Sequence, residues 1–268
     1  MSGYALTFLK NGNKDGQHKF EETSDFDRIL DLYIFDRKLR LLVIDALERV
    51  EIAIRACISD TMCVNHGAHW YVDRSHFVAH FDHTKLLKDI SNKMQYNPAT
   101  GKSPIIFIEH YYANYSSPEL PPSWMVFELV SFGTVSQVFG NLIGSNQKAI
   151  AKIFGLHPKV LRSWLHTLSY LRNLCAHHQR LWNRTFTIKP ITAKGYEEYL
   201  DPNDRLYAQL AVVQVLLKKI AVDSMWPRKI NDLVNGYSAF PASKMGFPSD
   251  WRNQPLWGIA KPKKKNSA

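Results

Sequence analysis

The sequence lacks any long uninterrupted run of apolar residues. Its most apolar stretch, LAVVQVLLKKIAV, is broken by Gln214, Lys218 and Lys219, so it is too short and too charged to span a bilayer. The first residues, MSGYALTFLK, have no basic start, no long apolar core and no small-residue cleavage site, so we expect them not to be a signal peptide. These absences predict a soluble, cytoplasmic protein without a membrane partner.

Cysteine is scarce, and the motifs of common cofactor sites are missing. The three cysteines, Cys57, Cys63 and Cys175, are odd in number and none belongs to a C-x-x-C pair, which predicts reduced, buried thiols. The sequence has no G-x-G-x-x-G, no Walker loop and no series of alternating strands. We therefore expect neither a cofactor nor a metal site.

What the sequence has in abundance is helical periodicity. From Asp25, a good N-cap, apolar residues recur at helical spacing to about Asn65, and the pattern ends at His66-Gly67. This predicts one long helix or two nearly collinear ones. Further helices are expected at 83–94, from Ser103-Pro104, from Ser123, up to Gly155, over 158–184, over 204–224 and at 228–237. The pattern predicts a single all-α domain over residues 1–260, followed by a flexible basic tail at 261–268.

The charge of the chain is strongly positive. The formal net charge is +10 and the isoelectric point is about 9.4, and four of the lysines lie in the tail KPKKKN. Without these four lysines the rest of the chain keeps a formal charge of +6. A charge of this sign indicates a polyanionic partner, nucleic acid or an anionic membrane surface, although many globular proteins are simply basic.

The predicted helix over 158–184 has two unlike faces. No acidic residue occurs between Lys159 and Arg184, whereas a solvated face normally mixes both signs. The expected apolar face holds Trp164, Leu168, Leu171, Cys175 and Trp182. The opposite stripe holds His166, Tyr170, Asn173, His177, Arg180 and Arg184, joined by Arg162. Imidazole, phenol, carboxamide and guanidinium groups together suit phosphate binding and proton transfer.

Simpler interpretations of this helix remain open. A metal site from His177 and His178 is disfavoured, because adjacent helical residues point about 100° apart. His178 is expected to turn toward the apolar face as a structural histidine, and Cys175 to lie on the core side, where a thiolate is disfavoured. The stripe can also be a basic face that contacts RNA or solvent without any chemistry.

Three stretches of the chain resemble a known family. RNLCAH has the form of the Arg-x4-His signature of the all-helical HEPN-domain ribonucleases. The phrase YLRNLCAHHQRLWNR is similar to the Abi-like family of bacterial abortive-infection proteins, the AbiD/AbiF group. The stretches ALERVEIAIRACISDTMCVNHGAHWY and KMGFPSDWRNQPLW support the resemblance. MSGYALTF resembles the middle of the family's N-terminal region, so the chain is expected to be short at this end.

The resemblance implies a HEPN-like helical bundle with additional helices and a metal-independent RNA endonuclease of phage defence or of a toxin–antitoxin system. His177 would act as base or acid, since histidine ordinarily titrates near pH 6.5. Arg172 would hold the phosphate and stabilise its charge, and Asn173 would orient the imidazole. Arg172 lies about 140° around the helix from His177, so the two meet only if the Arg side chain curls or the helix distorts.

The chain has only one such motif, and one histidine cannot easily perform both proton transfers. We therefore expect a homodimer with a composite site, in which His177 faces the same residue of the other copy across a two-fold axis. The less favoured alternative is that His178 is the second proton carrier. The expected partner is host or phage RNA, with tRNA as one option, and an antitoxin or a small RNA as regulator. The alternatives are a non-catalytic protein that holds a structured or regulatory RNA, and a protein scaffold.

The remaining candidates support the motif or bind RNA. We expect Arg180, Asn183 and Arg184 to bind the RNA backbone or to brace the dimer. Glu51 and Arg55 are expected to form a surface i, i+4 ion pair, with fixation of Arg172 by Glu51 as the alternative. The supporting or RNA-binding candidates are His166, Tyr170, His178, Arg180, Asn183, Arg184 and Glu51.

Overall fold

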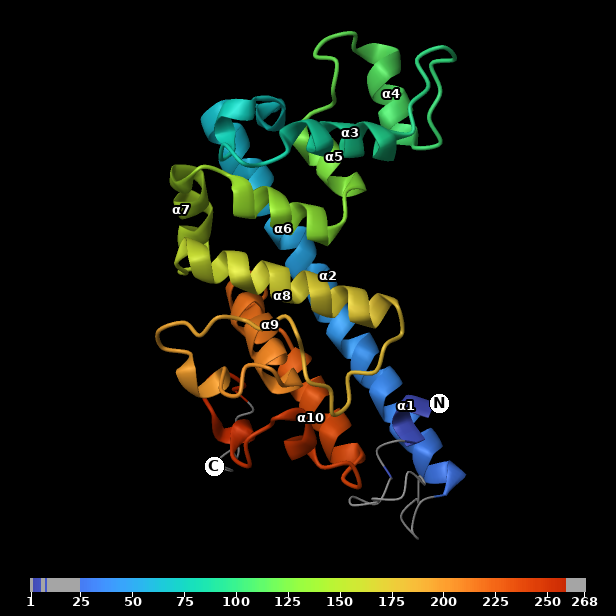
Figure 1. The fold of residues 1–268 in the computed structure, drawn as a ribbon, viewed down its shortest axis with the longest axis vertical. Helices are drawn as coiled ribbons and strands as arrows, with labels where there is room; N and C mark the ends of the chain where they lie inside the picture. The colour runs from blue at the N-terminus through green and yellow to red at the C-terminus, as the bar shows by residue number, and fades with distance from the viewer. Residues whose placement is uncertain (1, 6–7, 9–24, 259–268) are drawn as a thin grey trace, which may run out of the picture. The chain divides into compact units, whose positions relative to one another are not determined.

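The computed structural model describes residues 2–5, 8 and 25–258, and this part of the chain is built from helices (Figure 1). No strand occurs among these residues, only two isolated bridges, Phe77 with Leu142 and Asn97 with Lys102. The all-α prediction is confirmed. The α-helices are α1 (Ser2–Ala5), α2 (Phe26–His66), α3 (His83–Met94), α4 (Ile106–Asn114), α5 (Ser123–Leu129), α6 (Phe132–Asn141), α7 (Gly144–Ile153), α8 (Pro158–Ala176), α9 (Leu206–Ile220) and α10 (Trp226–Gly236).

Helix α2 is one continuous helix of 41 residues, which decides between the two predicted forms. The Asp25 carboxylate caps it, because Oδ1 accepts a hydrogen bond from the Arg28 amide at 2.7 Å. Its end at His66 coincides with Gly67, which has a φ of +83°. The sequence therefore predicted both ends of this helix correctly.

Two predicted helices differ from the observed ones for local reasons. The stretch that begins at Ser123 is divided into α5 and α6, and the Ser131 hydroxyl caps the second by accepting from the Thr134 amide at 3.1 Å. Helix α4 begins at Ile106 rather than at Ser103-Pro104. The Ser103 hydroxyl donates instead to the Met94 carbonyl at 2.8 Å, which holds it in the preceding loop.

The chain divides into two compact units. The first comprises residues 1–48 and 170–268, and the second comprises residues 49–169, so the boundaries lie inside α2 and α8. A single domain over residues 1–260 stays a prediction, and the tail 261–268 lies outside the described residues. Among the helices that the structure describes, none is long and apolar enough to cross a membrane.

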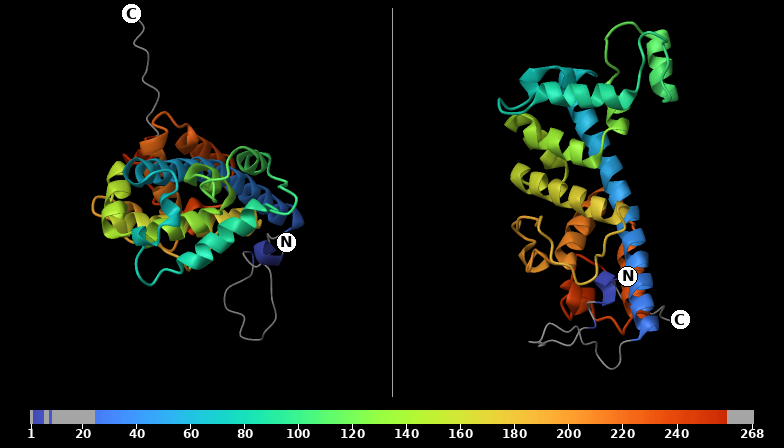
Figure 2. Two further views of the ribbon diagram at one scale, coloured as in Figure 1. Left: turned by 90° about the horizontal axis from the view of Figure 1, so that it is seen from above. Right: turned by 45° about the vertical axis from the view of Figure 1, so that its right-hand side comes forward.

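The first unit is built around α9 and the N-terminal part of α2. Every residue of α9 from Leu206 to Leu217 is buried. Trp182, which follows α8, packs edge-on against Phe35 of α2 with ring centroids 5.8 Å apart. The views of Figures 1 and 2 agree in placing α1 beside the first turns of α2. This unit holds Arg172, Asn173 and His177.

The second unit contains α3 to α7, and α3 packs against α5. An aromatic cluster forms part of its core, in which Trp70 contacts Phe127 edge-on and stacks on Phe77. Of the candidate catalytic, supporting and RNA-binding residues, this unit holds Glu51 and His166.

Candidate functional site

Helix α8 ends at Ala176, eight residues before the predicted end at Arg184. The two hydrogen bonds of a Schellman motif close it: the His178 amide donates to the Cys175 carbonyl at 3.1 Å, and the Gln179 amide to the Leu174 carbonyl at 2.9 Å. The prediction of a helix that carries the polar stripe to Arg180 and Arg184 was therefore wrong. These two arginines lie on the segment after the helix.

His178 is the left-handed residue of this motif, with a φ of +54°. Its side chain is exposed, as is that of His177. The prediction that His178 turns toward the apolar face was wrong, because the left-handed backbone takes the residue out of the helical register. The predicted apolar face of α8 is otherwise confirmed, since Trp164, Leu168, Leu171 and Cys175 are buried; Trp182 is buried too, but it lies after the helix.

Replacing His178 with glycine is expected to raise the free energy of unfolding by about 1 kcal/mol, because a side chain in the left-handed region costs about that much. Urea unfolding followed by tryptophan fluorescence measures the change. Asn183→Gly is the matched control: Asn183 also has a positive φ, +45°, but its Oδ1 accepts from Arg205 at 2.8 Å. The control should gain less, and an equal or larger gain would contradict this view of His178.

The three predicted catalytic residues lie at the end of α8. Asn173 and His177 are exposed, and Arg172 is partly exposed. The His177 amide donates to the Asn173 carbonyl at 3.0 Å, so the backbone of His177 still follows the helical ladder although the helix proper ends one residue earlier. An exposed carboxamide and an exposed imidazole therefore lie one helical turn apart, accessible to a large ligand.

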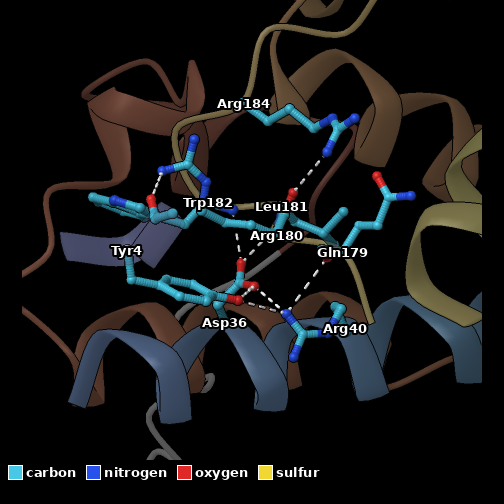
Figure 3. Close-up of polar contacts among 9 residues, drawn as sticks. Tyr4, Asp36, Arg40, Gln179, Arg180, Leu181, Trp182 and Arg184 are labelled. Atoms are coloured by element: carbon cyan, nitrogen blue, oxygen red, sulfur yellow. Dashed lines mark hydrogen bonds and ion pairs between the residues drawn. The ribbon is translucent and has the colours of Figure 1, made fainter. Parts of the chain in front are cut away.

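Sequence reasoning missed the buried acid beneath this segment. Asp36 of α2 is fully buried, and Figure 3 shows its carboxylate beneath the backbone that follows α8. Oδ1 accepts from the amides of Leu181 at 3.0 Å and Trp182 at 2.7 Å. Oδ2 accepts from the Tyr4 hydroxyl at 2.6 Å and from the Arg40 guanidinium. We call Tyr4, Asp36 and Arg40 the Asp36 cluster.

The Asp36 cluster joins α1 and α2 to the segment that follows the motif. Arg40 also donates to the Tyr4 hydroxyl at 3.0 Å and to the Gln179 carbonyl at 3.5 Å. Burial raises the pKa of the Asp36 carboxyl, and its hydrogen-bond donors oppose this effect. Burial and the Asp36 carboxylate together raise the pKa of Tyr4 to about 12, so its hydroxyl remains a donor.

The polar candidates after α8 contact their own chain. Arg180 donates to the Gly3 carbonyl, and Arg184 donates to the Arg180 carbonyl and the Tyr170 hydroxyl, both at 3.3 Å. Hydrogen bonds from Thr187 and Arg184 lower the pKa of Tyr170. These contacts, with the bond from Arg205 to Asn183, show that the side chains brace the segment; RNA binding by them stays a prediction.

Glu51 and His166 lie in the other unit. Glu51 and Arg55 form the predicted i, i+4 ion pair, but it is largely buried rather than on the surface, and Arg55 also donates to the Val130 carbonyl at 2.8 Å. Fixation of Arg172 by a carboxylate stays a prediction. His166 is exposed on α8, as the stripe required.

Cys175 is unsuited to act as a nucleophile. Burial raises the pKa of its thiol to about 12, and the side chain lies beneath the end of α8.

We expect iodoacetamide at about pH 8 to leave Cys175 unmodified in the folded protein and to alkylate it in urea, where a thiol titrates near its ordinary value. Peptide mass spectrometry measures both states. Alkylation at equal rates in both would contradict the burial of this thiol.

In the described part of the chain, no group of three or more His, Cys, Asp and Glu side chains is arranged to hold a metal ion.

The sequence was also compared with known proteins. A family described as Abi-like protein matches residues 1–183, more than half of the chain. The chain belongs to the Abi-like family. Membership indicates a role in abortive infection, the defence of bacteria against phage. A search of curated proteins and one of solved structures gave no match.

The Abi-like match includes the Asp36 cluster and the motif, and it ends at Asn183. Of the three stretches that carried the resemblance, KMGFPSDWRNQPLW lies outside the matched residues. This stretch packs within the first unit, where Trp251 and Trp257 contact each other edge-on with centroids 5.2 Å apart.

Proposed function

We propose that this Abi-like protein is a metal-independent RNA endonuclease whose reaction centre is His177. The observation that carries the proposal is the position of His177: its side chain is exposed at the end of α8, on a backbone that hydrogen bonds hold from Asn173 to Trp182. A general acid or base needs both properties, access to the substrate and a fixed position.

The reaction uses the 2′-hydroxyl of RNA as the nucleophile. The 2′-oxygen forms a bond to the adjacent phosphorus while the bond from phosphorus to the 5′-oxygen breaks, leaving a 2′,3′-cyclic phosphate and a 5′-hydroxyl. One imidazole takes the 2′ proton, and a second imidazole gives a proton to the departing 5′-oxygen. Arg172 stabilises the negative charge that builds on the phosphate oxygens, and Asn173 orients the imidazole or bonds the phosphate.

The second imidazole is that of another copy of the chain. The sequence has one Arg-x4-His motif, and a single helix places Arg172 about 140° from His177. A two-fold axis through the end of α8 brings two copies of each residue to one phosphate. The proposed enzyme is therefore a homodimer in which each protomer supplies one His177.

The test incubates the purified protein with end-labelled RNA in EDTA. We expect cleavage, with 2′,3′-cyclic phosphate on the upstream product, and no cleavage of a matched substrate with a single 2′-deoxyribose at the cut site. Cleavage that required added magnesium would contradict the metal-independent reaction. Binding of both substrates without any cleavage would favour the alternative, a protein that holds a structured or regulatory RNA.

A further inference from the structure

We propose that the Asp36 cluster positions His177 for proton transfer, so that Tyr4, from the N-terminal helix, is a positioning residue of the reaction centre. This inference rests on the proposed function, because it assigns a role in that reaction to a side chain that does not touch the substrate.

Both oxygens of the Asp36 carboxylate accept hydrogen bonds. Oδ1 accepts two backbone amides, those of Leu181 and Trp182, and Oδ2 accepts the Tyr4 hydroxyl and the Arg40 guanidinium. Because both oxygens belong to one planar carboxylate, we expect loss of a donor at Oδ2 to change the orientation of Oδ1 and the strength of its bonds to the two amides. The Tyr4 hydroxyl is therefore linked through one side chain to the backbone after α8.

The backbone between His177 and these two amides is short, and hydrogen bonds hold it in place. Leu181 lies four residues after His177, and the Schellman bonds of His178 and Gln179 fix the turn between them. Arg40 holds the carbonyl of Gln179 at 3.5 Å. A displacement at Leu181 consequently reaches His177 instead of being absorbed by a loop.

Packing alone does not explain why a carboxylate occupies position 36 of α2. Leu32, Leu39 and Val43 line the same buried part of α2, and burying a charged pair is often no more stabilising than an apolar pair of similar volume. What the carboxylate adds is a pair of directed bonds to amides of the segment after α8. Hydrogen bonds of this kind let a residue that does not touch the substrate fix the position of one that does.

The test is Tyr4→Phe, which removes the hydroxyl and keeps the ring. We expect kcat for RNA to fall about 10-fold with little change in KM, as for other residues that hold a reacting group in place. The imidazole carbon–proton signal of His177, assigned in NMR spectra with His177→Gln, should shift, and that of His166 should not. Tyr33→Phe is the matched control, because the Tyr33 ring packs edge-on against Tyr4 with centroids 5.7 Å apart, outside the three residues of the cluster.

An unmoved His177 signal with an unchanged kcat in Tyr4→Phe would overturn the inference, even if the variant were less stable. The same holds if Tyr33→Phe has an equal effect, since the loss would then reflect packing. The NMR measurement needs no substrate. If the wild-type protein does not cleave RNA, the proposed function fails, while the His177 signal still decides whether the cluster positions this residue.

Discussion

His177→Ala is expected to lower the rate of RNA cleavage at least 100-fold, because proton transfer by a positioned side chain commonly contributes that much or more. In a homodimer the substitution removes the base and the acid together. Initial rates on labelled RNA in EDTA measure the loss, and RNA binding by the same variant should stay near the wild-type value, since an imidazole contributes little to holding the phosphate backbone.

His178→Asn is the control for this prediction. His178 is adjacent to His177 and also exposed, and asparagine tolerates the left-handed backbone of this position. We expect it to keep the wild-type rate. A loss of cleavage in His178→Asn with activity retained in His177→Ala would reverse the roles assigned to the two histidines.

Asp36→Asn is expected to lower the free energy of unfolding by about 3–5 kcal/mol, because it leaves the Arg40 guanidinium buried without its counter-charge. Asparagine also has one oxygen where the carboxylate uses two. Its NH2 group would therefore lie against one of the hydrogen-bond donors that now contact Asp36. Urea unfolding followed by tryptophan fluorescence measures the change, and Trp182, whose amide binds Asp36, is one of the seven tryptophans that report it.

The double variant Asp36→Asn with Arg40→Leu removes both charges and keeps an oxygen at residue 36 that can accept the amides of Leu181 and Trp182. Removal of both partners of a buried ion pair costs much less than removal of one. We expect the double variant to be more stable than Asp36→Asn. A loss below about 1 kcal/mol in Asp36→Asn would show that this cluster contributes no more than an exposed ion pair does.

The sequence predicted those features that depend on local chemistry. The Asp25 cap and the Gly67 end of α2 are residue types with specific terminal roles, and the structure has both. The end of α8 was missed because the left-handed residue of its Schellman motif is His178, where glycine is the usual residue. Without a glycine, the helical period was extended past its true end to Arg184.

The Asp36 cluster was missed for a different reason. Asp36 lies among the buried residues Phe35 and Leu39 of α2, which was a signal, but its pair with Arg40 has the i, i+4 spacing of an ordinary surface ion pair. Its burial depends on amides 145 and 146 residues away in sequence. The spacing of residues within one helix cannot reveal a contact so distant in sequence. The Glu51–Arg55 pair was predicted to be exposed for the same reason, because its burial also depends on residues far away in the sequence, such as Val130.

The most direct test of the central claim, that two copies of His177 share one phosphate, mixes wild-type protein with His177→Ala. After subunit exchange, verified by native mass spectrometry, activity should follow the fraction of dimers with two wild-type chains, about one quarter at equal amounts. If each chain carried a complete site, about one half would remain. That result, or full activity of a monomer at the assay concentration, would contradict the composite site.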